Sequence, residues 1–214
     1  MAYINPRAIK AQKVLQEDAS GLVAYESQDL DRPLQFDLVL SGASLNESEL
    51  EVCLGLVEYT SKNDYTNSSM GWDKRKKREE MQDPEMIYLL VREKKSATED
   101  SLEGKPHVLG YISFMLTHDD PPHEDREVVY IYEIHLDERL RGQGLGSRLI
   151  GYVEHVAQEC QIDKTMLTVF TANKGAKRLY EALGYTKDAC SPGDRVMRTK
   201  TIMADYVIMS KVLG

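Results

Sequence analysis

One carboxylate and two phenol groups lie close together in the stretch 128–150, where side chains that handle protons are concentrated. The first half of this stretch alternates in the manner of a β-strand. The alternation predicts that Glu133 shares a face with Ile131, while Tyr130 and Tyr132 share the opposite face. Flanking Ile131 and Ile134 make burial of the Glu133 carboxylate plausible, and the alternative is a glutamate on a solvated face. Aromatic residues of strands often belong to the core, so both tyrosines have that alternative role.

Three glycines follow this strand, and they open a helical pattern of apolar residues. A strand that passes through a glycine-rich turn into a helix N-terminus leaves several backbone N–H groups without partners. These donors and the positive end of the helix dipole suit a diphosphate. The spacing R-x-x-G-x-G, from Arg141 to Gly146, differs from the dinucleotide motif G-x-G-x-x-G. No Lys-Ser/Thr pair follows the last glycine, which excludes a P-loop.

The order of expected elements positions this stretch in a mixed α/β layer. Helices are expected at 6–19, after 44, at 73–81, at 147–161 and at 173–183. Strands are expected at 34–40, 86–92, 108–117, 128–136, 166–170 and 203–210. Ser44 and Glu47 have the form of a capping box, residues 65–72 read as a loop, and the charged run 73–81 reads as a solvated helical face. A meander of strands followed by strand–helix–strand crossovers is the predicted topology.

The composition is that of a soluble globular domain. The chain has 214 residues, 42% hydrophobic and 29% charged, with a formal net charge of -8. This acidic balance argues against direct binding of nucleic acid. The three cysteines form no metal-type pair, and the sequence shows neither a membrane span nor a signal-peptide core. We expect a protein of the cytoplasm and nucleus, with an N-terminal helical segment (1–33) packed on one domain (34–214).

Two motifs together resemble the GNAT acetyltransferase superfamily. Residues 141–146 read Arg-Gly-Gln-Gly-Leu-Gly, which fits the superfamily's cofactor pattern Q/R-x-x-G-x-G/A. Residues 173–185 fit its later helix pattern N-x-x-A-x-x-x-Y-x-x-x-G-F/Y. The resemblance implies a GNAT fold, in which a mixed, mostly antiparallel central sheet is flanked by helices and its fourth and fifth strands splay apart at an acetyl-CoA site.

Three further segments, 71–81, 130–136 and 166–170, resemble the N-alpha-acetyltransferase D family. Members of that family acetylate the free N-terminus of histones H-four and H-two-A, whose chains begin Ser-Gly-Arg-Gly. The resemblance therefore implies acetyl-CoA as co-substrate, no metal, and histone N-terminal tails as substrates. It also implies a monomer that works without an obligate auxiliary subunit, away from membranes.

The resemblance assigns cofactor contacts residue by residue. Backbone N–H groups of the glycine turn would bind the CoA diphosphate, and one backbone N–H of the fourth strand would polarise the acetyl carbonyl. Asn173 would contact the pantetheine arm, and Tyr180 is a candidate acid for the CoA sulfur. The expected cofactor residues are Ile134, His135, Leu136, Arg141, Gly142, Gln143, Gly144, Leu145, Gly146, Asn173 and Tyr180.

The catalytic group is expected among Glu133, Tyr132 and Tyr130, with Glu133 as the preferred general base. An acidic loop, residues 118–125, is a candidate reader of the substrate arginine, and its alternative is a solvated loop. The expected substrate-binding residues are Tyr65, Trp72, Thr117, Asp119, Tyr132, Thr168, Cys190 and Tyr206. Two other functions stay open: a GNAT enzyme that acetylates a lysine side chain or small amine, and a CoA-binding scaffold without activity.

Overall fold

A seven-stranded sheet forms the centre of the computed structural model, which describes residues 5–27, 30, 33–94, 107–199 and 201–214. The strand order is β1-β2-β3-β4-β5-β9-β6, and the β4–β5 pair is parallel while the other neighbours are antiparallel. The strands are β1 Leu34–Val39, β2 Ile87–Glu93, β3 Val108–His118, β4 Glu127–Leu136, β5 Lys164–Phe170, β6 Thr186–Lys187 and β9 Tyr206–Val212. The predicted mixed, mostly antiparallel sheet is confirmed.

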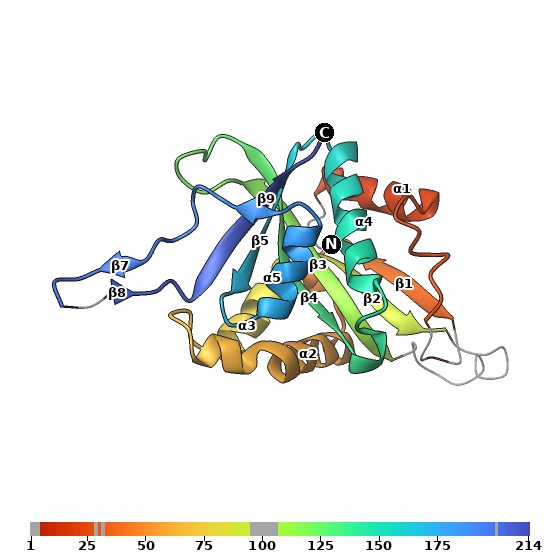
Figure 1. Cartoon of the computed structure of the whole chain (residues 1–214). Helices are drawn as coiled ribbons and strands as arrows, with labels where there is room; N and C mark the ends of the chain where they lie inside the picture. Colours follow the sequence, from red (N-terminus) through yellow and green to blue (C-terminus); the bar gives the residue numbers. More distant parts are fainter. Residues whose placement is uncertain (1–4, 28–29, 31–32, 95–106, 200) are drawn as a thin grey trace.

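Helices cover both faces of this sheet (Figure 1). One apolar core lies between the sheet and α1, α4 and α5, and a second lies between the sheet and α2 and α3. The helices are α1 Ile9–Glu17, α2 Glu47–Thr66, α3 Lys74–Met81, α4 Leu145–Glu159 and α5 Lys174–Ala182, with 3-10 turns η1 Pro6–Ala8, η2 Gly42–Ser44 and η3 Glu138–Leu140. A small hairpin, β7 Arg195–Val196 and β8 Thr201–Ile202, projects from the body at the left of Figure 1.

The α1 helix packs against α4, and the Tyr152 hydroxyl of α4 donates a hydrogen bond to the Ala11 carbonyl of α1 at 2.9 Å. In the part of the chain that the structure describes, no helix is both long and apolar enough to cross a membrane. The N-terminal helix thus lies against α4 and shares its core, on the face of the sheet opposite α2 and α3.

The fourth and fifth strands separate, as the GNAT resemblance implies. Their register pairs are Val129 with Thr165, Tyr130 with Met166 and Ile131 with Leu167. Beyond these pairs β4 continues to Leu136 and β5 to Phe170 with no register pair between them. Among the residues that the structure describes, the edge of β4 that faces β5 has no strand partner from Tyr132 onward, so its backbone groups are left for other uses.

A β-bulge in β4 reverses one prediction. Ser113 pairs with Glu133 and the next residue of β3, Phe114, pairs with Ile131, so Tyr132 is an extra residue in β4. Such a bulge shifts the alternation by one position and redirects the following side chains. Ile131 belongs to the core beneath α4, whereas Glu133 points to the side of α2 and α3. The prediction that both residues share a face was wrong.

Three local predictions on α2 and α3 were also wrong. The capping box is formed by Asn46 and Glu49, whose side chains each accept from the other's backbone N–H, and not by Ser44 and Glu47. The α2 helix runs on to Thr66, so Tyr65 lies in its last turn and not in a loop. The charged helix α3 is not wholly solvated, because its Lys77 is buried.

Candidate active site

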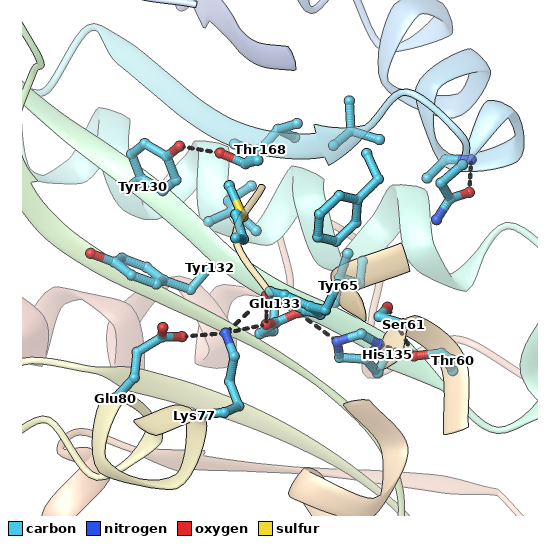
Figure 2. A pocket seen from close by; sticks show the side chains of 18 of the residues that line it. Thr60, Ser61, Tyr65, Lys77, Glu80, Tyr130, Tyr132, Glu133, His135 and Thr168 are labelled. Carbon is cyan, nitrogen blue, oxygen red and sulfur yellow. Dashed lines mark hydrogen bonds and ion pairs between the residues drawn. The ribbon is translucent and has the colours of Figure 1, made fainter. Parts of the chain in front are cut away.

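A cavity of about 1210 Å³ lies where β4 and β5 separate. Its walls come from α2, α3, the end of β3, β4, β5 and α5, which are brought together from distant parts of the sequence. Figure 2 shows the side chains that line it, with Glu133 and His135 of β4 facing α2 and α3, and with Tyr130 beside Thr168 of β5. The splay of the sheet thus opens a cavity that β4 and β5 both line.

Glu133 is the centre of a buried hydrogen-bond network (Figure 2). Its Oε1 accepts from the Lys77 ammonium and from the Tyr65 hydroxyl, both at 2.9 Å. Its Oε2 lies 2.6 Å from Nε2 of His135. The side chain of Glu133 is 9% exposed, as is that of Lys77. The ammonium of Lys77 also donates to Glu80 at 2.7 Å and to the Tyr65 hydroxyl at 2.9 Å.

This network keeps Glu133 ionised. Burial by itself would raise the pKa of the Glu133 carboxyl, but the charges and hydrogen bonds of Lys77 and His135 outweigh burial and lower the pKa to about 2. Burial likewise opposes the charged form of Lys77, but Glu133, Tyr65 and Glu80 outweigh it and raise the Lys77 pKa. An ionised carboxylate with so low a pKa holds a cation well and is a weak proton acceptor.

The two tyrosines of β4 lie on the opposite side of the network from His135 (Figure 2). Their ring centroids are 5.4 Å apart, and the Tyr130 hydroxyl shares a 2.6 Å hydrogen bond with the Thr168 hydroxyl of β5. Burial raises the pKa of Tyr130, so its phenol stays neutral. Tyr132 is the extra residue of the bulge and is 37% exposed. Both rings border the space beside Glu133, where they restrict the size of an entering group.

The glycine turn precedes α4 at the other end of the cavity. Gly142 has φ +74° and Gly144 has φ +83°, backbone conformations that L side chains rarely adopt. A Cβ at either position would meet no atom within 4 Å, so open space lies against this part of the backbone. The first N–H groups of α4 have no intrahelical partner, and together with this open space they fit a diphosphate. Arg141 lines the cavity here, with its guanidinium 5.8 Å from the Tyr59 ring centre.

The expected cofactor residues divide into two groups. Those that line the cavity are Ile134, His135, Leu136, Arg141, Gly146, Asn173 and Tyr180. Gly142, Gln143, Gly144 and Leu145 lie in or next to the turn without lining the cavity itself, and Leu145 is buried in the core. The Gln143 side chain accepts from the hydroxyls of Tyr25 and Ser27, so the N-terminal segment braces the turn. Asn173 caps α5 by accepting from the Ala176 N–H at 3.1 Å.

The expected substrate residues also divide. Tyr65, Thr117, Tyr132, Thr168 and Trp72 line the cavity. Of the described residues, Asp119, Cys190 and Tyr206 are among those that do not. The acidic loop does contribute a carboxylate to the cavity, but it comes from the neighbouring residue, Asp120.

Asp119 is instead part of a buried ion cluster. Its carboxylate accepts from the Lys164 ammonium at 2.5 Å, and Lys164 also lies 2.6 Å from Asp188. The carboxylate of Asp119 is thus satisfied inside the protein, which speaks against the expectation that it reads a substrate arginine. Cys190 donates its backbone N–H to Asp188, 3.0 Å away, so it belongs to the same cluster. Lys164 already supplies the cation that these two carboxylates require.

Lys77, Thr60, Ser61 and Glu80 line the cavity but were not foreseen. For Lys77 the sequence held one usable signal. Met81 is the sole apolar residue of α3, and the residue four positions before it, Lys77, shares its face of the helix. Both are the buried residues of α3. Thr60 and Ser61 lie on the cavity-facing side of α2 and carried no comparable signal.

The family model described as "Acetyltransferase (GNAT) family" matches residues 57–185, more than half of the chain. This chain belongs to the GNAT acetyltransferase family. The match includes every residue that lines the cavity, from Tyr59 to Tyr180. The GNAT fold and the acetyltransferase class expected from the two motifs are thereby confirmed.

Curated relatives match shorter segments of the GNAT domain. The chain is 40% identical over 100 residues to N-alpha-acetyltransferase 40 of Saccharomyces cerevisiae, covering 40% of this chain and 35% of that protein. It is 31% identical over 74 residues to the uncharacterized N-acetyltransferase YycN of Bacillus subtilis, covering 35% of this chain and 47% of that protein. The chain thus spans less than half the length of these relatives.

Solved structures share the fold at low sequence identity. Arabidopsis thaliana NAA60, in complex with a bisubstrate analogue, superposes with a TM-score of 0.55 at 14% identity and covers 85% of this chain and 99% of its own. The NatC complex bound to Gag peptide and CoA contains a chain that superposes with a TM-score of 0.54 at 18% identity. The match covers 85% of this chain and 99% of that chain. The architecture of the GNAT sheet is therefore shared over most of the chain.

Proposed function

We propose that this protein is an acetyl-CoA-dependent N-alpha-acetyltransferase that acetylates free protein N-termini beginning Ser-Gly-Arg-Gly, as in histones H-four and H-two-A. One observation carries the proposal: a single cavity reaches from Arg141 and Gly146, at the two ends of the glycine motif, to a buried, ionised Glu133. The yeast relative at 40% identity supports an N-terminal amine as the acceptor. Glu80 and Asp120 line the same cavity and would attract an arginine at the third position.

The glycine turn and the free edge of β4 would hold acetyl-CoA. The bound cofactor supplies the acetyl group as an activated thioester. Backbone N–H groups of the turn and of the first turn of α4 bind the diphosphate, aided by Arg141. On the edge of β4 that has left β5, between Tyr132 and Leu136, a backbone N–H donates to the acetyl carbonyl. Burial raises the pKa of Tyr180, so this phenol keeps its proton and would donate a hydrogen bond toward the CoA sulfur.

Glu133 orients the amine. An α-amino group has a pKa near ~8, and the Glu133 pKa is about 2. The depressed pKa of Glu133 therefore makes this carboxylate a weak acceptor for the amine proton. Glu133 therefore accepts a hydrogen bond from the amine and draws it toward the thioester, and a further group must take the proton. Tyr130 and Tyr132 fit a small first side chain, because their rings narrow the space next to Glu133.

Peptides with free and blocked termini test this function. The substrate is a Ser-Gly-Arg-Gly peptide with a lysine further along, presented with its α-amine free or already acetylated, and mass spectrometry locates the new acetyl group. We expect acetylation of the free terminus and none of the blocked peptide. Acetylation of the lysine in both peptides would instead identify an enzyme for another amine. A bovine relative, 39% identical over 56 residues, is named thialysine N-epsilon-acetyltransferase. CoA binding without any transfer would identify a scaffold.

We also infer that the protein works in the cytoplasm and nucleus as a monomer without an auxiliary subunit. The support is the resemblance to the N-alpha-acetyltransferase D family and the free state of all three cysteines, Cys53, Cys160 and Cys190. The net charge of -8 favours basic protein tails over nucleic acid as partners. Size-exclusion chromatography of the active protein tests the monomer.

A further inference from the structure

His135 lies two residues after Glu133 on β4 and uses both of its ring nitrogens. Nε2 is 2.6 Å from Oε2 of Glu133, and Nδ1 is 2.7 Å from the hydroxyl oxygen of Thr60 on α2. The residue is 6% exposed and lines the cavity. A buried imidazole with two partners is commonly a rigid structural element. Which of its nitrogens carries a proton depends on what the two partners can donate.

Thr60 can serve as either donor or acceptor toward this ring. Its hydroxyl has one hydrogen, and the acceptors within reach include the Leu56 carbonyl at 2.8 Å and Nδ1 of His135 at 2.7 Å. When the hydrogen points to Nδ1, the histidine is neutral and carries its proton on Nε2. When the hydrogen points to the Leu56 carbonyl, the hydroxyl oxygen is free to accept from a protonated Nδ1. Glu133 accepts from Nε2 in both states.

Both charge states of His135 are therefore fully hydrogen-bonded, and they differ by the rotation of one hydroxyl group. The groups around the ring are also compatible with a change of His135 from neutral to positively charged. Glu133 of β4 faces it as a carboxylate; Lys77 and Glu80 of α3 lie beyond Glu133; Tyr65 of α2 bonds to Glu133; and the Tyr111 ring of β3 lies 5.6 Å away. Burial raises the pKa of Tyr111, so this neighbour stays neutral. Glu133 can hence stabilise an imidazolium next to the amine site.

We propose that His135 holds the proton released by the substrate amine and that Thr60 turns its hydroxyl to admit it. The proposal rests on the proposed function. It names the group that accepts the amine proton, a role for which Glu133 is too weak a base. An N–H bond of the ammonium breaks and its electron pair stays on nitrogen. Water in the cavity takes this proton and passes one to Ser61, Ser61 passes one to Thr60 across 3.2 Å, and Thr60 passes one to Nδ1, where the new N–H bond forms. Each hydroxyl gains and loses one proton, and solvent later removes the proton from His135.

Nuclear magnetic resonance of the ring tests the proposal without any activity. Long-range proton–nitrogen spectra of histidine-labelled protein are recorded from about pH 5 to pH 9, the range in which histidines change charge, and the His135→Gln variant assigns the signals. We expect Nε2 to carry a proton throughout, while Nδ1 changes from bare to protonated as the pH falls. A ring that keeps one state at every pH, or one whose proton sits on Nδ1 with Nε2 bare, overturns the proposal.

Two threonines of α2 give a matched kinetic test. Thr60→Val removes the hydroxyl at constant shape; Thr66→Val does the same at an exposed position, where the hydroxyl also donates to the carbonyl four residues earlier. We expect Thr60→Val to lower kcat by about tenfold, with a KM near that of the wild type and a weakened fall of activity at acid pH, and Thr66→Val to match the wild type. Equal kcat and pH profiles for all three proteins contradict the proposal.

These outcomes are separate from failure of the proposed function. If the wild type does not acetylate the Ser-Gly-Arg-Gly peptide, that function fails, and the ring spectra still decide the protonation states of His135. The kinetic comparison then moves to whichever amine the wild type acetylates. Thermal unfolding of both threonine variants shows whether either has lost its fold.

Discussion

A buried lysine defines the chemistry of the site at the scale of single residues. Removing one partner of a buried ion pair leaves an uncompensated charge, which costs about 3–5 kcal/mol. Lys77 and Glu133 form such a pair, with Tyr65 donating to the same carboxylate oxygen. The pair is one reason that Glu133 stays ionised, and it explains why a carboxylate placed beside a cofactor site is not itself a strong base. The proposal above accordingly gives proton acceptance to His135, the neighbour whose two charge states are both hydrogen-bonded.

Lys77→Met should uncouple stability from the ionisation of Glu133. The folded-state pKa of Glu133 is depressed from 4.5 to about 2, so its ionisation stabilises the fold above about pH 4.5 and this stability is lost as the pH falls toward 2. The shift of 2.5 units corresponds to about 3 kcal/mol. We expect Lys77→Met to lower the free energy of unfolding by about 3 kcal/mol at pH 7 and by much less at pH 3, measured by urea unfolding at each pH.

Lys76→Met is the control, because Lys76 is exposed on the same helix. It should change the free energy of unfolding by less than about 0.5 kcal/mol at either pH. If the two variants lose equal stability, or if the loss in Lys77→Met is the same at pH 3 and pH 7, then Lys77 is not the group that keeps Glu133 ionised.

At the scale of elements, periodicity predicted the order of the main helices and strands but not their exact geometry. The 2.0 and 3.6 residue patterns show which segments form strands and helices. The bulge at Tyr132 is not visible in that pattern, because it depends on how β3 and β4 are paired and not on either strand alone. Nothing in the residues of α3 shows that β4 offers a carboxylate to Lys77. The charge run by itself therefore predicts a solvated helical face.

Substitutions in the glycine turn should separate the effect of backbone conformation on CoA binding from the effect of the space available to a side chain. Gly144 has φ +83°, whereas a Cβ on Gly146 would make only ordinary contacts, 3.7 Å from Leu179 and 3.9 Å from Ile134. A left-handed conformation costs a non-glycine residue about 1–2 kcal/mol. We expect Gly144→Ala to weaken CoA binding by about tenfold, the equivalent of 1.4 kcal/mol, and Gly146→Ala to bind within about threefold of the wild type, by isothermal titration calorimetry. Equal affinities for the two variants would mean that the turn does not set the diphosphate site.

At the scale of the whole molecule, the site exists only after the sheet has formed. Lys77 and Glu133 are 56 positions apart in the chain, and Tyr65 and Glu133 are 68 apart. The motifs therefore indicated the cofactor turn, which is local, better than the amine side, which is assembled from α2, α3 and β4. The ion cluster of Lys164 is equally non-local, since it joins the loop after β3 to the residues after β6.

This ion cluster predicts different roles for two adjacent aspartates. Asp119 is bound to Lys164, and its Oδ1 accepts from the Asp120 backbone N–H at 2.8 Å, so Asp119 fixes the loop that carries Asp120. Asp120 faces the cavity, where its carboxylate can meet a substrate arginine. Asp120→Asn should raise KM for a Ser-Gly-Arg-Gly peptide by about tenfold and leave KM for a Ser-Gly-Ala-Gly peptide nearly unchanged, since a charged hydrogen bond contributes about 1.5–3 kcal/mol.

Asp119→Asn should behave differently, because it acts through the fold and not through the substrate. Loss of its charge weakens the cluster around Lys164, so we expect a lower Tm and a KM that rises by a similar factor for both peptides. Steady-state kinetics on the two peptides with each variant decides between the roles. If Asp119→Asn discriminates between the peptides and Asp120→Asn does not, the buried aspartate is the reader of the arginine and the loop must rearrange when the peptide binds.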